Sequence, residues 1–387
     1  MKRIFIYLFV ILLLSAGSLL VVSQGGGSEK RGEYLLPGNV KEGWKVFTTK
    51  GCGSCHAIWG EGGRGGPDLG TLPEFYTSQS QLAALMWNHG PEMWARMAAQ
   101  KISFQKISKK EMSDLFAFLY FIRYMDEPGD PQKGKRLIET KACIKCHTIK
   151  EGKREDLIRW GMYVNPILWA QIMWNHAPQM EKEMKRLGIS IPGFKGNEMI
   201  DLIAYIRSLS SDVEKVYLSP GDPQSGEKLF TAKGCAQCHS PHGTLDLMKK
   251  KDFPKTLAQL AGTMWNHSHI MAKGMEERGI KRPTLFSGEM ADLIAFLFSM
   301  RYFDDPGDPL QGRLAFTKKQ CHSCHTKGKS PDLAILKGRI SPISMAQTMW
   351  NHGPEMLERM RKTKLPWQKI DGKEMADLME YLNRGMP

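Results

Sequence analysis

Three kinds of pattern are missing from this chain of 387 residues. No strand-like alternation of useful length appears, which argues against a β-sandwich or barrel. No cysteine lies outside four short motifs, so none is left for a disulfide or an isolated thiol. The lysines are scattered and not clustered with aromatic residues, so we expect no nucleic-acid partner. What remains is an ordinary globular balance, with 42% hydrophobic and 24% charged residues, and length alone predicts two to four domains.

The N-terminus carries a targeting pattern. Basic residues at positions 2 and 3 precede an almost unbroken apolar run over residues 4–22, and Ser23–Ser28 follows as a flexible linker. The pattern is typical of a signal peptide with a cleavage site at Val21-Val22-Ser23. It equally fits an uncleaved inner-membrane anchor, because the run nearly reaches bilayer length. Both alternatives predict export, to a periplasmic or other extracytoplasmic location.

Self-similarity is the dominant signal in the rest of the chain. Four units open with Pro-Gly-Asn or Pro-Gly-Asp and close with Glu-Met-x-Asp-Leu before an apolar helical run. Between these ends each unit contains a Cys-x-x-Cys-His motif and a Met-Trp-Asn-His segment. We therefore predict an all-α protein with a leader and linker over 1–30 and four tandem domains, called repeats 1 to 4, over residues 31–127, 128–219, 220–305 and 306–387.

The four Cys-x-x-Cys-His motifs are typical of covalent haem attachment. Two thiols three positions apart reach the two vinyl groups of one porphyrin, and the histidine that follows points at the iron from the same side. A redox dithiol or half of a zinc site would explain one Cys-x-x-Cys, but not four copies that each end in histidine. The predicted cofactor is haem c, four per chain, held by Cys52, Cys55, His56; Cys143, Cys146, His147; Cys235, Cys238, His239; and Cys321, Cys324, His325.

With these motifs in place, each repeat resembles a class I cytochrome c domain over nearly all of residues 35–387. The resemblance implies an N-terminal helix that crosses a C-terminal helix, with Gly43 and Phe47 at the crossing against Phe118 or Leu119. In the other repeats the matching aromatic residues are Tyr205, Phe296 and Tyr381.

The family also implies a Pro-x-Leu turn whose carbonyl accepts a hydrogen bond from the proximal histidine and fixes its ring. Repeats 1 and 4 match it at Pro67-Asp68-Leu69 and Pro331-Asp332-Leu333. Repeats 2 and 3 keep only Asp-Leu, in Glu155-Asp156-Leu157 and Leu245-Asp246-Leu247, so the contact is less securely predicted there.

The second axial ligand is missing from its usual place in the family, a methionine before proline. Ile191, Arg282 or Leu365 stands there instead, and repeat 1 has no such proline. The protein has eleven histidines: four proximal, four in the Met-Trp-Asn-His segments, and three others, at positions 242, 269 and 322, interpreted as surface or haem-edge residues. The predicted distal ligands are therefore His89, His176, His267 and His352.

Methionines that follow in the same segments are the alternative ligands. Methionine is abundant, with 24 copies, and often only fills space in a core. The first methionine of each segment is the main alternative: Met93, Met180, Met271 or Met356. A further alternative is the second methionine, which is Met97, Met184, Met275 or Met360. An iron with an open position is the last alternative. Trp87, Trp174, Trp265 and Trp350, just before these histidines, are interpreted as core or haem-packing aromatics and not as an electron relay.

Four similar haem domains predict electron transfer between redox partners in a respiratory chain and no enzymatic activity. A haem enzyme, such as a peroxidase or an oxyanion reductase, is the alternative and needs one repeat with an open iron. An electron-conducting subunit of a larger complex or filament is another. The formal net charge of +14 favours acidic docking partners or an anionic membrane surface.

Overall fold

A computed structural model describes residues 38–71, 78–147, 157, 165–210, 221–240, 245–247, 252–286, 288–300, 302, 306–325, 333 and 340–385. All of them belong to one compact unit, Leu35–Pro387. The predicted apolar helix over residues 4–22 lies outside the described residues. Within the described part, no helix is long and apolar enough to cross a membrane.

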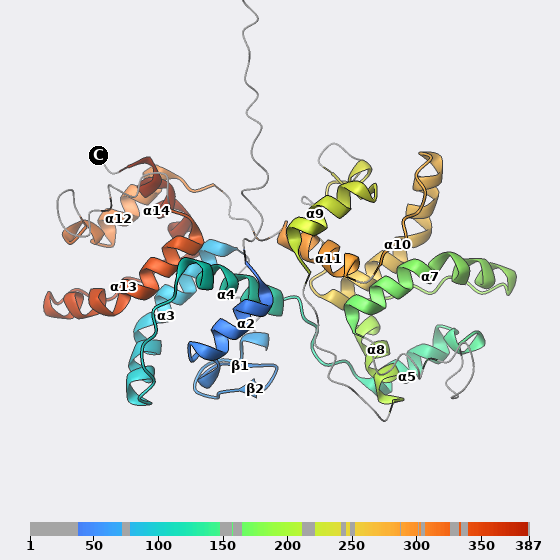
Figure 1. The fold of residues 1–387 in the computed structure, drawn as a ribbon, viewed down its shortest axis with the longest axis horizontal. Coiled ribbons are helices and arrows are strands. Elements are labelled where there is room, and N and C mark those ends of the chain that lie inside the picture. Colours follow the sequence, from blue (N-terminus) through green and yellow to red (C-terminus); the bar gives the residue numbers. More distant parts are fainter. Residues whose placement is uncertain are drawn as a thin grey trace, which may run out of the picture. The chain divides into compact units, whose positions relative to one another are not determined.

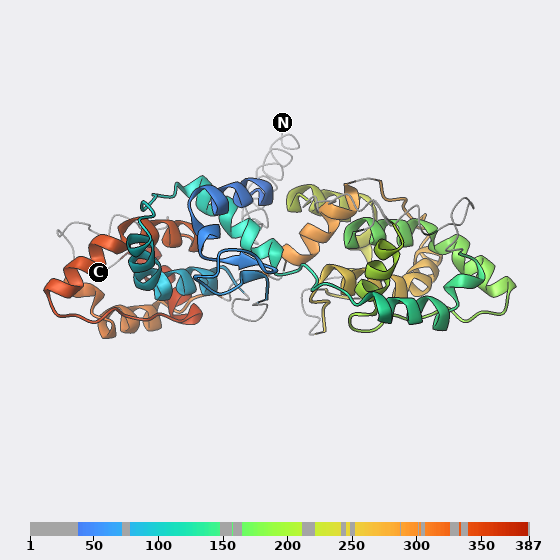
Figure 2. The same cartoon turned by 90° about the horizontal axis from the view of Figure 1, so that it is seen from below.

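The described residues form helices joined by loops, with a single short hairpin among them (Figure 1 and Figure 2). The all-α fold class is thereby confirmed. Repeat 1 contains α2 (Val40–Thr49), η2 (Cys52–Ser54), β1 (Ala57–Ile58), β2 (Glu61–Gly62), η3 (Leu69–Thr71), α3 (Gln79–Ala99) and α4 (Lys109–Ile122). The antiparallel hairpin aligns Ala57 with Gly62 directly after the first Cys-x-x-Cys-His motif.

The other three repeats present the same order of a first helix, a short 3₁₀ turn, a long helix and a last helix. Repeat 2 has α5 (Pro131–Thr140), η4 (Cys143–Lys145), α7 (Pro166–Arg186) and α8 (Glu198–Ser208). Repeat 3 has α9 (Pro223–Ala232), η5 (Cys235–Gln237), α10 (Leu257–Glu277) and α11 (Glu289–Ser299). Repeat 4 has α12 (Pro309–Lys318), η6 (Cys321–Ser323), α13 (Pro342–Lys362) and α14 (Gly372–Arg384).

A glycine lets the first and last helices of each repeat cross closely, as predicted. A Cβ atom at Gly43 would lie 2.0 Å from the carbonyl oxygen of Asp114 and 2.6 Å from the Cβ of Phe118. Phe47 packs beside it, with its ring centroid 5.5 Å from that of Phe118. The same approach to the backbone of an aspartate, at 2.0 Å, recurs at Gly134, Gly226 and Gly312, with Tyr205, Phe296 and Tyr381 alongside.

The aspartate of each Glu-Met-x-Asp-Leu segment fixes the start of the first helix. Its carboxylate accepts a hydrogen bond from the backbone N–H of that helix's N-cap residue, which is Asn39, Asp130, Asp222 or Asp308, at 2.6–2.8 Å. Each cap side chain in turn accepts from an N–H in the first turn of its helix. These caps satisfy donors that a helix start leaves open, so the cap residue and the aspartate of the last helix together fix where the first helix begins.

Packing between repeats does not follow the chain order. Helix α3 of repeat 1 packs against α13 and α14 of repeat 4, whereas α7 of repeat 2 packs against α10 and α11 of repeat 3. Figure 1 shows the α3–α13 and α7–α10 pairs side by side. Repeats 2 and 3, which are consecutive in the chain, therefore form one pair. Repeat 1 pairs with repeat 4, the last repeat of the chain.

Candidate functional site

The four Cys-x-x-Cys-His motifs adopt one backbone conformation. The residue before each first cysteine has a positive φ, from 58° at Gln320 to 84° at Gly51, which ends the first helix and starts a 3₁₀ turn. In every repeat the histidine N–H donates to the carbonyl of the first cysteine at 2.9 Å. The turn therefore holds both thiols and the imidazole in a single loop of five residues.

A lysine anchors each of these turns to the last helix of its own repeat. Lys50 Nζ donates to the Lys106 carbonyl at 2.9 Å and pairs with Glu111 at 3.0 Å. The Ser108 N–H, and after it Lys50, lower the pKa of the Glu111 carboxyl. The equivalent pairs are Lys141–Glu198, Lys233–Glu289 and Lys319–Glu374, at 3.0, 2.9 and 2.9 Å. Because these pairs are half-buried, they position the motif more firmly than an exposed pair does.

The predicted contact of the proximal imidazole is confirmed in repeat 1. His56 Nδ1 lies 3.0 Å from the Pro67 carbonyl, and because a carbonyl only accepts, Nδ1 is the protonated nitrogen. Nε2 is then the nitrogen that can bind a metal. A Cβ at Gly66 would lie 2.7 Å from the His56 ring, so the chain packs tightly against the imidazole. In repeat 3, the Leu245 N–H donates to the Cys238 carbonyl at 3.0 Å. The corresponding turns of repeats 2 and 4, at residues 155–156 and 331–332, lie outside the described residues.

The cysteines fit covalent attachment better than dithiol redox chemistry. Burial raises the pKa of Cys52 and of Cys321 to about 11, and it raises the pKa of Cys143 and Cys235 as well. A redox dithiol depends on a first cysteine whose pKa is lowered. A raised pKa at the first cysteine does not match that requirement.

The predicted distal histidines lie on the long helix of each repeat. His89 on α3 donates from Nδ1 to the Leu85 carbonyl at 2.9 Å, and His267 on α10 donates to the Thr263 carbonyl at 2.8 Å. Metal-binding histidines commonly use one ring nitrogen in this way and bind through the other. His352 on α13 contacts the Glu355 carboxylate at 3.2 Å, also through Nδ1. In all three, Nε2 is the nitrogen left for a metal.

In repeat 2 the two candidate ligands lie close to each other. The ring centroids of His147 and His176 are 6.2 Å apart. Two imidazoles bound on opposite sides of one metal, through bonds of about 2 Å as found for zinc, place their centroids roughly 6 Å apart. The spacing fits a pair of axial ligands. The alternative ligands Met93, Met180, Met271 and Met356 lie on the same helices, and each packs half-buried against the hydrophobic core.

The four tryptophans before these histidines are buried core residues, as predicted. The sequence did not reveal what their indole N–H groups do. Each donates across a repeat boundary to a backbone carbonyl: Trp87 to Gln368, Trp350 to Gln105, Trp174 to Pro283 and Trp265 to Pro192, at 2.6–3.1 Å.

The asparagine of each Met-Trp-Asn-His segment was also missed, and it makes the most regular contact between repeats. Asn88 accepts from the Ile370 N–H at 2.9 Å and donates to the Ile370 carbonyl at 2.8 Å. Asn351 holds Ile107 in the same way from the opposite side. In the other pair, Asn175 holds Leu285 and Asn266 holds Phe194. We call these four contacts the asparagine clamps; they are reciprocal within each pair.

A proline inside the long helix supports the clamp in at least two repeats. Pro91 has no N–H to donate to the Trp87 carbonyl, which accepts instead from Trp367 Nε1 of repeat 4 at 3.2 Å. Pro178 likewise leaves the Trp174 carbonyl to Arg282 of repeat 3, at 2.9 Å. The segment that was predicted only to supply a distal ligand therefore also joins repeats.

The remaining predictions about histidine concern residues outside these motifs. His269 and His322 are exposed, as expected for surface residues, and His242 lies outside the described residues. Within the described part of the chain, no group of three or more histidine, cysteine or acidic residues forms a metal site of its own.

Comparison with known proteins bears on repeat 1. Residues 40–120 match the family model described as Cytochrome c, a stretch that runs from α2 through the Cys-x-x-Cys-His turn into α4. Searches among curated proteins and solved structures gave no match. The matched stretch contains the complete set of features described above, from the glycine crossing to the anchored turn. Residues 40–120 are therefore a c-type cytochrome domain, of the family that binds haem covalently and uses it for electron transfer.

Proposed function

We propose that the whole chain is an exported tetrahaem c-type cytochrome that passes electrons between redox proteins. The observation that carries the proposal is that the geometry of the cytochrome domain at residues 40–120 recurs three more times. Each repeat has the glycine crossing, the turn with a histidine N–H bonded to the first cysteine, and the lysine anchor. This shared geometry supports the extension of the family match from one repeat to the other three.

The chain's own residues would hold four haems in the same manner. The two cysteines of each motif would attach the porphyrin, and His56, His147, His239 and His325 would supply the proximal nitrogen. When bound, haem iron supplies a one-electron redox couple whose potential depends on its axial ligands. The protein anchors each motif to its last helix through a lysine, so that little has to move when an electron arrives or leaves.

Haem stoichiometry tests the proposal directly. A pyridine haemochrome assay and the intact mass of the purified protein should give four haems per chain. Two or three haems would contradict the four-domain interpretation. Replacement of Cys146 should remove one haem and loosen mainly repeat 2, because a porphyrin supplies much of the core of so small a domain.

For the distal ligand we propose histidine in all four repeats, supported by the Nδ1 hydrogen bonds and by the 6.2 Å spacing of His147 and His176. Bis-histidine haems are low-spin and have lower potentials than haems with a methionine ligand. His176→Ala should give one high-spin haem that binds carbon monoxide, whereas Met180→Leu should leave the spectrum unchanged. The reverse outcome would assign the methionine as the ligand.

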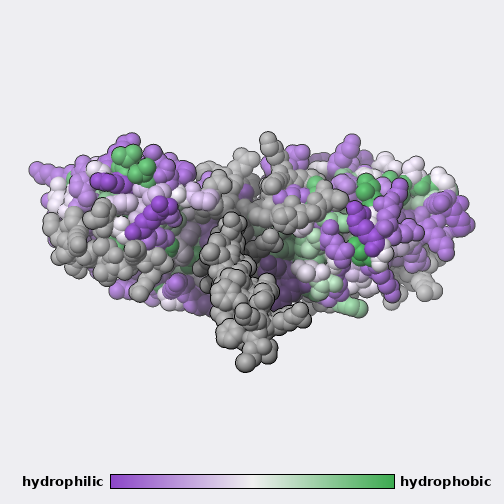
Figure 3. Space-filling view, turned by 90° about the horizontal axis from the view of Figure 1, so that it is seen from above, coloured by the Kyte–Doolittle hydropathy of each residue, from purple (hydrophilic) through white to green (hydrophobic). Residues whose placement is uncertain are grey.

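The proposed partners are redox proteins with acidic docking surfaces, because the chain carries a net charge of +14. Figure 3 shows hydrophilic residues over much of one face, with apolar residues in small separate areas. Two axial histidines per iron would leave no open coordination position, which supports an electron carrier over a haem enzyme. N-terminal sequencing of native protein tests export: a start near Gln24 indicates a cleaved leader, and a retained Met1 with detergent-dependent extraction indicates an anchor.

A further inference from the structure

Repeats 1 and 3 meet through a reciprocal aromatic contact at the ends of their last helices. The ring of Tyr120 packs on Tyr302 with centroids 3.7 Å apart, and Phe298 packs on Tyr124 at 3.8 Å. Tyr120 and Phe298 occupy the same position in their repeats, and so do Tyr124 and Tyr302. The contact is therefore isologous, as in a two-fold dimer. We call these four residues the aromatic junction.

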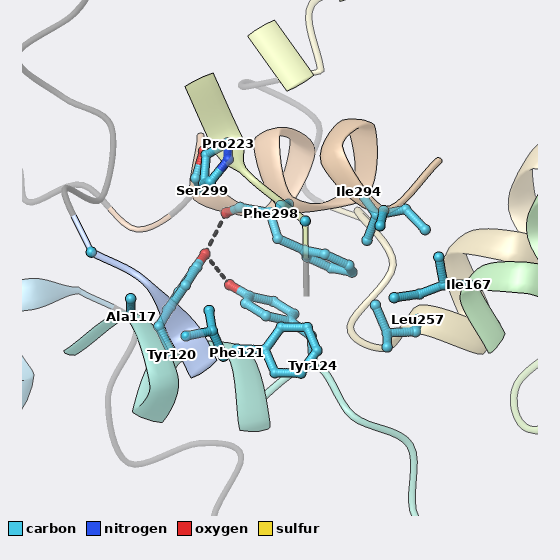
Figure 4. A pocket seen from close by; sticks show the side chains of 15 residues that line it. Ala117, Tyr120, Phe121, Tyr124, Ile167, Pro223, Leu257, Ile294, Phe298 and Ser299 are labelled. Carbon is cyan, nitrogen blue, oxygen red and sulfur yellow. Dashed lines mark hydrogen bonds between the residues drawn. The ribbon is translucent and has the colours of Figure 1, made fainter. Parts of the chain in front are cut away.

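Hydrogen bonds fix this junction. Tyr124 donates its hydroxyl hydrogen to the Tyr120 hydroxyl, which in turn donates to the Phe298 carbonyl (Figure 4). A small apolar pocket adjoins the rings, with Ile294 and Leu257 on its other side (Figure 4). The junction is thus a buried and specific contact between the two repeats.

A second contact joins the same two repeats at the start of α10. The Tyr124 carbonyl accepts from the Leu257 N–H at 2.9 Å, and the Asp126 carboxylate accepts from the Ala258 N–H at 2.9 Å and from the Thr256 hydroxyl. The chain that leaves repeat 1 therefore caps the long helix of repeat 3, which is the helix that carries His267.

Within each pair, the candidate distal ligands lie next to the residues buried where the long helices pack. His89 and His352 precede Gly90 and Gly353, both buried; the edge of the Trp94 ring lies where a Cβ of Gly353 would be, 2.1 Å away. His176 and His267 precede Ala177 and Ser268, which are 0% and 2% exposed, and Ser268 donates to Glu181 across the pair at 2.7 Å. The helices that carry the candidate distal ligands are thus in direct contact within each pair.

From these contacts we infer that electrons move through the repeats in the order 2, 3, 1, 4 or its reverse, and not in chain order. The inference rests on the proposed function. Electron transfer between buried cofactors weakens steeply with distance, so the route follows packed interfaces: the clamps join 2 to 3 and 1 to 4, and the aromatic junction joins 3 to 1. Repeats 2 and 4 are then the two ends that exchange electrons with partner proteins.

Kinetics in a junction variant test the order. Tyr124→Ala combined with Phe298→Ala removes one of the two reciprocal ring contacts and leaves all four motifs in place. After injection of single electrons by pulse radiolysis, the phase that equilibrates the two pairs should slow or disappear, while the faster phases within each pair keep their rates. The control is Leu314→Ala, because Leu314 is 61% exposed and lies outside the junction; it should leave every phase unchanged.

A folded junction variant with four haems that equilibrates as fast as the parent protein would overturn the order. The haem count is measured first, because fewer than four haems in the unmodified protein would contradict the proposed function instead. If the variant loses haem, dipolar couplings measured by electron paramagnetic resonance in the unmodified oxidised protein decide. We expect two strong couplings, between haems 2 and 3 and between haems 1 and 4, and a weaker one between haems 3 and 1. Three equal couplings would contradict the inference.

Discussion

The asparagine clamp of repeat 1 permits a prediction whose size can be worked out from the structure. Asn88→Ala removes two hydrogen bonds, of 2.8 and 2.9 Å, between the asparagine side chain and the backbone of Ile370. Ile370 is only 5% exposed, so its N–H and carbonyl lose a partner in a largely dry site. With about 1 kcal/mol net for each bond, and more where a buried group stays unpaired, we expect a loss of about 2–4 kcal/mol.

Two measurements check this prediction. Denaturant unfolding of the holoprotein should show a lower midpoint, and hydrogen exchange followed by mass spectrometry should show faster exchange at Ile370. A loss of about 2 kcal/mol corresponds to a change of about thirty-fold in the opening equilibrium. The exchange measurement matters because a protein with several domains need not unfold in one step. The effect should centre on the α3–α14 contact and leave the repeat 2–repeat 3 pair unchanged.

Asn197→Ala is the matched control. Asn197 is exposed at the N-cap of α8, and its side chain makes no capping hydrogen bond, so its truncation should change stability by less than about 0.5 kcal/mol. Asn266→Ala breaks the equivalent clamp on Phe194 and should cost about as much as Asn88→Ala. If Asn88→Ala leaves the exchange at Ile370 and the unfolding midpoint unchanged, the clamps do not hold the repeats together.

Two further predictions concern the helix crossing and the junction of repeats 1 and 3. Gly43→Ala should destabilise the protein by more than about 2 kcal/mol, because the new methyl group would lie 2.0 Å from the Asp114 carbonyl oxygen. The control Gly274→Ala should be neutral or slightly stabilising, because the nearest neighbour of its methyl group, Arg278, is 3.6 Å away. Equal unfolding midpoints for the two variants would disprove the close crossing. Burial raises the pKa of Asp126 from 3.8 to about 6, so between these pH values the folded state binds more protons than the unfolded state. The contribution of Asp126 to stability is therefore complete below about pH 4 and is lost as the pH rises through 6. The loss amounts to up to about 3 kcal/mol. Asp126→Asn should flatten this part of the pH–stability curve measured by urea unfolding, and an unchanged slope would show that Asp126 does not carry it.

The features predictable from sequence were those that local spacing determines. Cys-x-x-Cys-His fixes a turn, and a glycine four residues before an apolar residue marks the helix crossing, so the fold class and the contact of Gly43 with Phe118 followed from short segments. The hydrogen bond from His56 to Pro67 followed from the family resemblance and lies only eleven residues away. Each of these features involves few residues and recurs with little change.

The pairing of repeats could not be predicted in the same way, because the partner segments are far apart in the chain. Two signals were nevertheless present. All four repeats keep an asparagine before the candidate distal histidine, although binding of a metal by that histidine does not need one. The last helices of repeats 1 and 3 end in aromatic residues, which are Tyr120 and Tyr124 in repeat 1 and Phe298 and Tyr302 in repeat 3. At the position of Tyr120, repeats 2 and 4 have Arg207 and Asn383 instead. That alternation distinguishes the two repeats that form the aromatic junction.

The separation of clamp partners has a consequence for biosynthesis. Trp87 finds its acceptor 281 residues further along the chain, whereas Trp174 finds its own after 109 residues and Trp265 reaches back over 73. The entropic cost of closing a loop rises only slowly with the number of residues in it. The difference in separation therefore changes the final stability by less than about 1 kcal/mol. It does change timing, because domains emerge and fold from the N-terminus onward. Repeats 2 and 3 can pair while the last repeat is still being made, so repeat 1, the first to be completed, is the last to be paired and exposes its tryptophan and asparagine to chaperones, proteases and neighbouring chains for longest.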